Sequence, residues 1–440
     1  MKNATQVCAC VGGQLVGAQS CLADGSGWSA CDCPDSGAGG GDAAVDAISD
    51  ASVEANAPND VSVEADGPSD ASVEAGTVAD GEADAVADGD WDAHVESCTP
   101  GEKRCGVVNA SQPQQCDATG RWQDLGAECA FECVGAGACG MASCVGGATG
   151  QRDCGPGGNE DCCTSLLVPG GTVQLDSTHS ATVGDYRLDK YEVSVGRFRG
   201  YVDAVVGGWL PPAASGKHAH LNGGRGLSDG NGGYEPGWDV TWNSNLPIAK
   251  ATWDGSNGLA CDAAYQTWMS AAGVYEKRPI NCVNWYQTAA FCIWDGGFLP
   301  SEAEWQYAAA GGSENRTYPW GSTVPGANVN LAVYGCYRGA NGTCSGVANI
   351  GPVGSVPAGN GRWGHSDLAG NVLEWTLDWY LWSYGPAASA NYANVTDAAS
   401  RVFRGGAYYY DASALLASYR YGYAPAYRRD LNGARCARVP

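Results

Sequence analysis

Residues 278–309 read RPINCVNWYQTAAFCIWDGGFLPSEAEWQYAA, and this stretch predicts two helices. The first is expected at 284–294, where Asn284 is the N-cap and a glutamine three residues later occupies the capping-box position. The second is expected to start at Ser301, whose capping-box partner is the glutamate three residues later. The glycine pair at 311–312 ends this second helix, because glycine readily adopts the left-handed conformation that closes a helix.

Short strands are expected on the N-terminal side of these helices. Apolar and polar residues alternate at 172–175 and at 186–193, which is typical of strands. After Tyr318 the chain is rich in Gly, Pro, Asn and aromatic residues, so we expect loops with short strands there. Residues 166–440 are therefore expected to form one domain, and the family resemblance given below implies that it has an α+β fold with little regular secondary structure.

Three segments precede this domain. Residues 1–34 and 96–165 are rich in cysteine and poor in large apolar residues, so cross-links must hold them together. Residues 35–95 are Ala- and Asp-rich and repeat a ten-residue pattern, seen at 49–55 and 59–65 and again ten residues later. We weigh a calcium-binding array for this repeat, but favour a disordered linker, because almost no apolar surface offsets the entropy of ordering it.

The net charge of −24 comes mostly from the linker. Between Asp35 and Glu96 there are 17 acidic residues and no Lys or Arg. The other 31 acidic residues are largely balanced by the 24 basic ones, so the rest of the chain has a net charge of only −7. Nucleic acid is excluded as a partner, because phosphate binding needs clustered Lys and Arg. No stretch is long and apolar enough to span a membrane.

The 21 cysteines indicate an oxidising compartment, since no pair of Cys-x-x-Cys knuckles with zinc spacing occurs. They form clusters of five (8–33), ten (98–163) and six (261–436). We therefore expect an extracytoplasmic protein. The given start has no signal peptide. We expect the true start upstream, with a partner for the odd cysteine there; a free thiol is the alternative.

An ordered series of motifs over about 260 residues resembles the formylglycine-generating (sulfatase-modifying factor) family. The matching segments are 191–198 (YEVSVGRF), 278–286 (RPINCVNWY), 298–309 (FLPSEAEWQYAA), 318–321 (YPWG), 352–357 (PVGSVP), 367–375 (DLAGNVLEW), 401–406 (RVFRGG) and 433–438 (GARCAR). The resemblance implies a sulfatase-modifying-factor fold related to C-type lectin-like domains. It also implies a disulfide between Cys292 and Cys436.

Four further cysteines of the last cluster, Cys261, Cys282, Cys336 and Cys344, allow three connectivities, and the sequence does not choose among them. One of these joins Cys336 to Cys344 across a short loop and leaves Cys261 with Cys282.

The resemblance places a copper site in the segment after the Arg-Gly-Gly motif. Catalytic members carry a serine there and then two cysteines, whose thiolates bind one copper ion that activates oxygen to oxidise a substrate cysteine. The serine position is Ala407 here, and the two cysteine positions are Tyr410 and Leu415. Neither side chain can ligate copper, so we do not expect copper or the family's oxidase activity.

A calcium site is also implied by the resemblance. Asp367 and Glu374 flank a glycine-containing turn, and the backbone carbonyls of Gly370 and Val372 complete a set of hard oxygen ligands. We expect structural calcium at these four residues. The alternative is that Asp367 caps a turn and that Glu374 pairs with an arginine.

Tyrosines crowd the region of the expected copper site and predict either a binding cleft or a packed, loop-rich core whose hydroxyl groups bond to the backbone. The candidate lining residues are Ala407, Tyr408, Tyr410, Leu415, Trp375 and Arg420. A second, weaker candidate is a metal pair at His218 and His220, which lacks an evident third ligand.

We expect a non-catalytic recognition or structural module, stabilised by calcium, that binds an unknown peptide, protein or glycan. One alternative is an oxidoreductase-type enzyme that uses a non-standard site. The other is a carbohydrate-binding module, suggested by fold analogy and tyrosines alone. The sequence does not reveal the ligand or the oligomeric state.

Overall fold

The computed structural model describes residues 141–384 and 390–440, and before them residue 100 and the segments 5–9, 16–20, 103–105, 113–124, 133–134 and 138–139. The chain divides into two units, Met1–Asp88 and Gly89–Pro440. In the first unit, β1 (Thr5–Ala9) pairs antiparallel with β2 (Val16–Ser20). The linker predicted at 35–95 lies outside the described residues.

The second unit begins with short antiparallel strands. They are β3 (Lys103–Cys105), β4 (Pro113–Cys116), β5 (Trp122–Asp124), β6 (Cys133–Val134) and β7 (Ala138–Cys139). The order β3-β4-β5 forms one small sheet, and β6 pairs with β7. Among the described residues, no helix is both long and apolar enough to cross a bilayer.

Residues 141–164 pack against the domain that follows them, although the sequence assigned them to the preceding cysteine-rich module. This segment contains η1 (Ala142–Cys144) and two disulfides, Cys144–Cys163 and Cys154–Cys162. The backbone N–H of Ser143 donates to the buried Asp295 carboxylate at 2.8 Å. The structured body therefore includes residues ahead of the expected boundary at 166.

The helices of this body are short. They are α1 (Val195–Val206), α2 (Lys250–Trp253), α3 (Trp285–Trp294), α4 (Glu302–Ala309) and α5 (Tyr337–Ala340), with 3₁₀ turns η2 (Asn222–Gly224), η3 (Val240–Asn245), η4 (Gly312–Glu314), η5 (Val347–Asn349), η6 (Pro357–Gly359) and η7 (Ala412–Leu415). Both predicted helices are confirmed as α3 and α4, and each starts with the predicted capping box. The left-handed Gly311 follows the end of α4.

The body contains two sheets and a hairpin. One sheet has the order β14 (Arg420–Tyr423), β13 (Arg401–Arg404), β12 (Leu373–Trp379) and β15 (Asn432–Gly433); the second has the order β16 (Ala437–Arg438), β11 (Tyr186–Asp189) and β8 (Ser165–Val168); the hairpin pairs β9 (Gly171–Gln174) with β10 (Ser180–Val183). All neighbouring strands are antiparallel except β12 and β15. The strand predicted at 186–193 ends at Asp189, because the chain then turns into α1, whose N-cap is Ser194.

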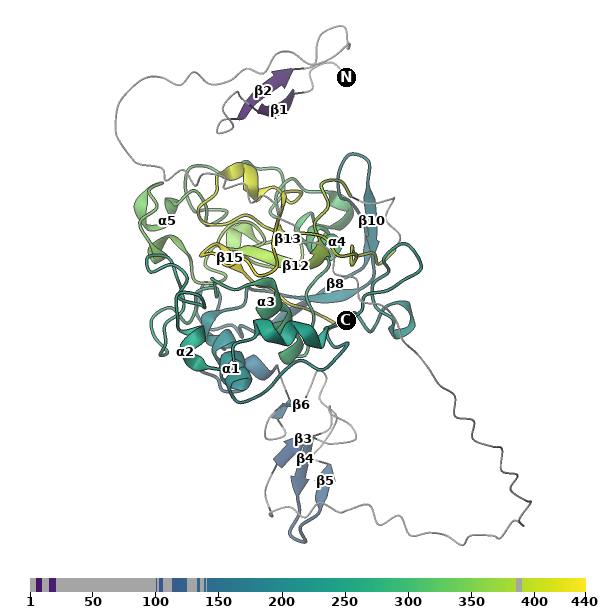
Figure 1. The fold of residues 1–440 in the computed structure, drawn as a ribbon. Coiled ribbons are helices and arrows are strands. Elements are labelled where there is room, and N and C mark those ends of the chain that lie inside the picture. Colours follow the sequence, from purple (N-terminus) through teal and green to yellow (C-terminus); the bar gives the residue numbers. More distant parts are fainter. Residues whose placement is uncertain are drawn as a thin grey trace, which may run out of the picture. The chain divides into compact units, whose positions relative to one another are not determined.

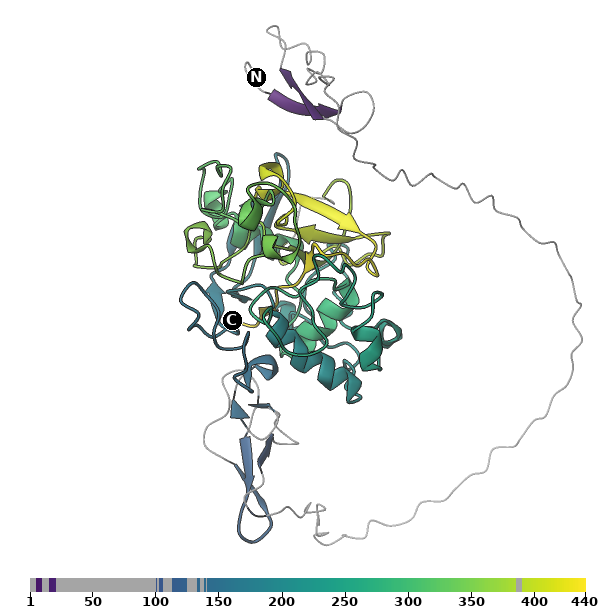
Figure 2. The same ribbon diagram turned by 90° about the vertical axis from the view of Figure 1, so that its left-hand side faces the viewer.

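Aromatic rings fill the core between the helices and the larger sheet. Helices α1 and α3 pack together, and α3 also contacts β12 (Figure 1 and Figure 2). Phe198 of α1 stacks on Phe291 of α3 with ring centroids 5.3 Å apart. Both α3 and β12 contribute side chains to one groove.

Candidate functional site

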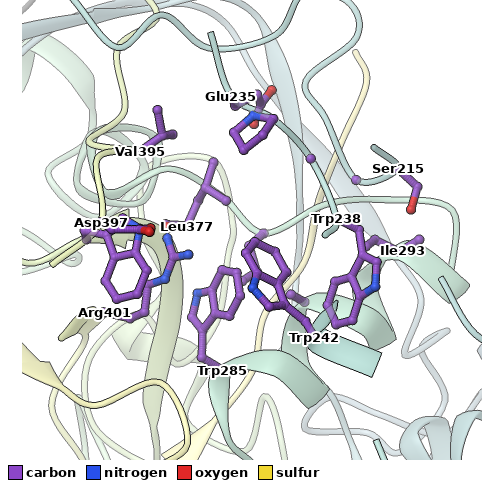
Figure 3. Close-up of a pocket in the computed structure, with 16 residues that line it drawn as sticks. Ser215, Glu235, Trp238, Trp242, Trp285, Ile293, Leu377, Val395, Asp397 and Arg401 are labelled. Atoms are coloured by element: carbon purple, nitrogen blue, oxygen red, sulfur yellow. Dashed lines mark hydrogen bonds between the residues drawn. The ribbon is translucent and has the colours of Figure 1, made fainter. Parts of the chain in front are cut away.

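A groove walled by indole rings opens between the 213–242 loop, α3 and the β12–β13 strand pair (Figure 3). We call it the tryptophan groove and define it by Trp238, Trp242, Trp285, Trp379 and Arg401. Leucine, isoleucine, valine and alanine side chains line its inner part. The groove is thus mainly apolar, and its wall contains one basic side chain, Arg401, and two carboxylates, Glu235 and Asp397.

Local turn chemistry places the indoles. Asp239 caps η3 by accepting a hydrogen bond from the Thr241 backbone N–H at 2.8 Å, and this turn presents Trp242 to α3. The ring centroid of Trp242 lies 5.3 Å from Trp238 and 5.3 Å from Trp285, both nearly perpendicular. Edge-to-face contacts of this kind hold the three rings in fixed orientations.

Two of the indole N–H groups are already satisfied inside the protein. Trp238 donates to the Asn243 side chain at 2.9 Å, and Trp285 donates to a backbone carbonyl of β12 at 2.8 Å. A ligand could therefore contact the apolar faces of these two rings but could not accept hydrogen bonds from them.

Arg401 lies between two indoles at one end of the groove. Its guanidinium carbon is 3.8 Å from the ring centroid of Trp285 and 3.7 Å from that of Trp379. Nη1 donates to the carbonyl of Leu377 at 2.5 Å, while Nε is buried without a partner. Burial lowers the pKa of Arg401 to about 9, and the side chain stays a cation at neutral pH.

Glu235, a carboxylate of the groove wall, is paired with a histidine. His218 contacts Glu235 through Nδ1 and Glu304 through Nε2, each at 3.0 Å. Burial alone would lower the pKa of His218, but the two carboxylates raise it to about 10. Both ring nitrogens are used, and the ring centroid of His220 is 6.2 Å away, so the histidine pair is not arranged as a metal site.

The expected calcium ligand Glu374 contacts an arginine. Arg435 donates to the Glu374 carboxylate through Nε at 2.9 Å and Nη2 at 2.7 Å, and Trp305 Nε1 donates to it at 2.6 Å. Asp367 accepts from the backbone N–H of Gly354 at 2.5 Å. The contact between Glu374 and Arg435 is the arginine pairing that the sequence left open as the alternative to calcium.

A third carboxyl group, Glu192, lies near this pair. It accepts hydrogen bonds from the Val372 backbone at 3.0 Å and from the Asn371 amide at 2.6 Å. Burial, and then Asp367 and Glu374, raise the pKa of Glu192 well above its usual value. Burial also raises the pKa of Asp367 to about 6.

The residues fit a calcium ion only in part. The carboxyl groups of Asp367 and Glu192 and the carbonyls of Gly370 and Val372 are hard oxygen donors of the kind calcium prefers. The Glu374 carboxylate, however, is already paired with the guanidinium of Arg435, and this guanidinium would repel a calcium ion beside it.

The two copper positions differ sharply in environment. Leu415 is buried in a small apolar cluster with Tyr318, Tyr334 and Ala369. Tyr410 is partly buried beside the main core. The structure thus uses the position of Leu415 for packing.

The six residues of the predicted cleft do not line one hollow, because several of them are buried in the core or paired with other side chains. Trp375 is buried with its ring stacked on Phe403 at 3.5 Å, and Ala407 is fully buried. Arg420 forms a two-pronged ion pair with Glu302 at 2.6 and 2.7 Å.

Tyr408 does line a hollow, which is polar. It also contains Tyr265, Arg428 and Asp430, and the Tyr408 hydroxyl donates to the Asp430 carboxylate. The hollow in the tyrosine-rich region is therefore polar, and Tyr408 is the one residue of the predicted cleft that lines it.

All ten cysteines within 141–384 and 390–440 are in disulfides. Besides the two near α1, the pairs are Cys261–Cys282, Cys292–Cys436 and Cys336–Cys344. This is the pairing implied for Cys292, together with one of the three connectivities left open for the other four. The one cluster of metal-ligand types found among the described residues contains Cys144 and Cys163, which are bonded to each other.

Sequence reasoning missed the tryptophan groove. Its rings come from segments near residues 240, 285 and 379, and nothing in the spacing of these segments predicts that they meet. The available signal was the count of 16 tryptophans in a chain with only 5 phenylalanines.

Comparison with known proteins identifies the family. Residues 151–440 match the sulfatase-modifying factor enzyme 1-like domain. The chain is 29% identical to formylglycine-generating enzyme of Mus musculus over 236 residues, which cover 52% of this chain and 58% of that protein. It is 34% identical to inactive C-alpha-formylglycine-generating enzyme 2 of Bos taurus over 137 residues, 31% of this chain and 41% of that protein.

A solved structure, PvdO from Pseudomonas aeruginosa, aligns over 63% of this chain and 94% of that chain, at 22% identity and a TM-score of 0.42. The chain spans about half the length of the curated relatives it matches. With the ordered motifs and the match over 151–440, the chain belongs to the sulfatase-modifying factor enzyme 1-like domain family.

Proposed function

We propose that residues 151–440 form a non-catalytic recognition domain that acts outside the cytoplasm. The observation that carries this proposal is that every cysteine within 141–384 and 390–440 is in a disulfide. Copper(I) binding of the family's kind needs soft thiolate ligands. This part of the chain offers none, at the two expected positions or elsewhere.

A shift of the copper site to other cysteines is disfavoured by the packing. Cys292 and Cys436 are fully buried in the main core, as are Cys282 and Cys336. Freeing a thiolate there would break a disulfide and place a charge in an apolar setting, which costs several kcal/mol.

Copper binding and aldehyde formation test the proposal directly. The full chain, purified without reductant, is incubated with Cu(I), oxygen and a cysteine-containing peptide of the sulfatase type, beside an active family member as positive control. We expect no stoichiometric copper and no peptide aldehyde by mass spectrometry. Aldehyde formed by this chain at a rate comparable to the control would overturn the proposal and favour the oxidoreductase alternative.

The extracytoplasmic location rests on the same disulfides, because such bonds persist in oxidising compartments. Titration of the denatured, non-reduced protein with a thiol reagent checks the redox state. We expect the peptides that contain Cys261, Cys282, Cys292, Cys336, Cys344 and Cys436 to remain unlabelled. Labelling at any of them in protein isolated from its native source would contradict the assignment.

Calcium at Asp367 and its neighbours stays a prediction, and so does the relation to C-type lectin-like domains. The cluster of Glu192, Asp367 and Glu374 supports an ion, since like charges buried together repel. The Arg435 guanidinium opposes it. Unfolding of a Glu374→Gln variant with and without calcium distinguishes a calcium site from an ion pair with Arg435.

A further inference from the structure

Arg401 is a buried cation that lacks a complete set of partners. It is 4% exposed, and its one hydrogen bond within the described residues runs from Nη1 to the Leu377 carbonyl. Nε is buried without an acceptor, and among the described residues Nη2 has no acceptor and Arg401 forms no ion pair. Most of the other buried arginines, such as Arg197, Arg435 and Arg438, contact carboxylates directly.

The two indoles around Arg401 compensate part of the free energy that is lost when its charge is buried without an ion pair. Cation–π contacts with Trp285 and Trp379 hold the guanidinium in place and attract its charge. They satisfy none of its N–H donors, and an unpaired buried donor costs free energy. Arg401 lines both the inner and the outer part of the groove, and its Nη2, unlike Nε, is not among the buried unpaired atoms, so Nη2 is the donor that a ligand can reach.

Other charged groups near Arg401 leave it available. Glu235 is held by His218, and Asp378 accepts hydrogen bonds from the backbone N–H groups of Glu302 and Asn394. Asp397 is exposed at the rim beside Arg401 (Figure 3). The two are not paired among the described residues, although the Asp397 charge favours the charged form of Arg401 and so partly offsets the lowering of its pKa by burial. The rim carboxylate weakens the attraction for anions but does not occupy the guanidinium.

Apart from Ser215, Glu235 and Asp397, the side chains in the rest of the inner groove are apolar. Ala289, Ile293, Leu299, Leu377 and Val395 line it and offer only C–H groups from their side chains. A polyhydroxylated sugar ring would lose its water there without gaining hydrogen bonds, whereas a large apolar side chain gains by burial.

The outer groove continues past Trp242 to Val240 and Tyr286, so a chain attached to the buried group has a path to solvent. Its rim carries the exposed carboxylate of Asp239, which can accept peptide N–H donors. An extended polymer with a terminal anion and an apolar side chain matches both parts of the groove.

We propose that the tryptophan groove binds the C-terminal residue of a peptide that ends in a large apolar amino acid. Its carboxylate accepts from Arg401 Nη2, and its side chain packs between Trp242 and the aliphatic wall near Ile293. This names the ligand class of the proposed recognition domain and rests on that proposal, but its test does not involve copper or aldehyde.

Two matched probes test the proposal on the full chain. Acetyl-Gly-Gly-Leu with a free carboxylate and the same peptide as its amide are titrated by calorimetry and by tryptophan fluorescence. We expect the free acid to bind at least about tenfold more tightly, the size of one charge-assisted hydrogen bond. Equal binding of acid and amide, or no saturation by the acid up to about 5 mM, overturns the proposal.

Variants separate the roles of the groove residues. Arg401→Met should abolish the difference between acid and amide, and Asp397→Asn, at an exposed position, should tighten the acid about two- to fivefold because it removes a repelling charge. Trp382→Ala is the control, since Trp382 is 92% exposed and lines neither part of the groove. If Arg401→Met does not fold, the Asp397→Asn result decides: unchanged or weaker acid binding refutes the proposal.

Neutral oligosaccharides form the last arm. Tighter binding of cellotriose or chitotriose than of the acid peptide, lost in Trp242→Ala, would replace this proposal with a carbohydrate module. Failure of the peptide with no aldehyde formation leaves the non-catalytic assignment standing, so the two proposals fail separately.

Discussion

Replacing Glu374 with glutamine asks whether this buried carboxylate serves an arginine or an ion. Glu374 is 1% exposed and Arg435 is fully buried, and their contacts are 2.7 to 3.0 Å long. Glutamine keeps the volume of Glu374 and one acceptor oxygen, but leaves the guanidinium without its neutralising charge. Breaking a buried pair in this way costs about 3–5 kcal/mol.

The lower end of this range is expected, because Glu192 and Asp367 also attract Arg435. A loss of about 3 kcal/mol lowers the melting temperature of a domain of this size by roughly 6–12 °C. Arg435→Met should cost a similar amount, because Arg435 also donates to the carbonyls of Asp189, Lys190 and Ser366. The double variant should lose at least about 2 kcal/mol less than the sum of the two.

The assay is thermal and urea unfolding of the full chain, in EDTA and in millimolar calcium. Glu314→Gln is the matched control, because Glu314 pairs with Arg316 at the surface and should contribute less than about 1 kcal/mol. We expect the Glu374→Gln loss to be the same in both buffers.

The calcium hypothesis gives the opposite pattern. If Glu374 ligates an ion, EDTA alone destabilises the unmodified protein, and Glu374→Gln adds little once the ion is gone. That pattern, or a Glu374→Gln loss below about 1 kcal/mol in EDTA, would refute the ion-pair reasoning.

The remaining predictions concern His218 and the disulfides. Because the pKa of His218 is raised to about 10 when folded, its contribution is fully present below about pH 6.5 and is lost as the pH rises towards 10. The stability advantage over His218→Asn, at most about 5 kcal/mol, should therefore shrink over that range in urea titrations, and an advantage that grows with pH would contradict the pairing. Replacing both Cys292 and Cys436 with alanine opens a loop with a sequence separation of 144 and should cost about 5 kcal/mol, against about 2.5 kcal/mol for Cys336 and Cys344, whose separation is 8. Equal losses in urea unfolding would show that chain entropy does not set these contributions.

Sequence reasoning worked best where the interactions are local. The starts of α3 and α4 depend on hydrogen bonds between residues three apart, Asn284 with Gln287 and Ser301 with Glu304, so the motif contains both partners. The strand at 186–193 was predicted too long, because the alternation of side chains continues past Asp189 while the backbone leaves the sheet.

Reasoning about the cleft failed for a different reason. Tyrosine and arginine side chains suit a binding surface or a polar core equally well, and their sequence does not tell which partners they meet. Arg420 is held by Glu302, more than a hundred residues away, and Trp375 is covered by Phe403.

The sequence by itself indicated the family, through motifs in the family's order, and the resemblance placed Tyr410 and Leu415 at the positions where copper ligands would be expected. Only the tertiary structure decided that Glu374 contacts Arg435, that no cysteine of residues 141–384 and 390–440 is a free thiol, and that four indoles and Arg401 line one groove. The physical reason is range. Caps and motifs are read within a few residues, but an ion pair, a disulfide or a groove forms between segments that only folding brings together.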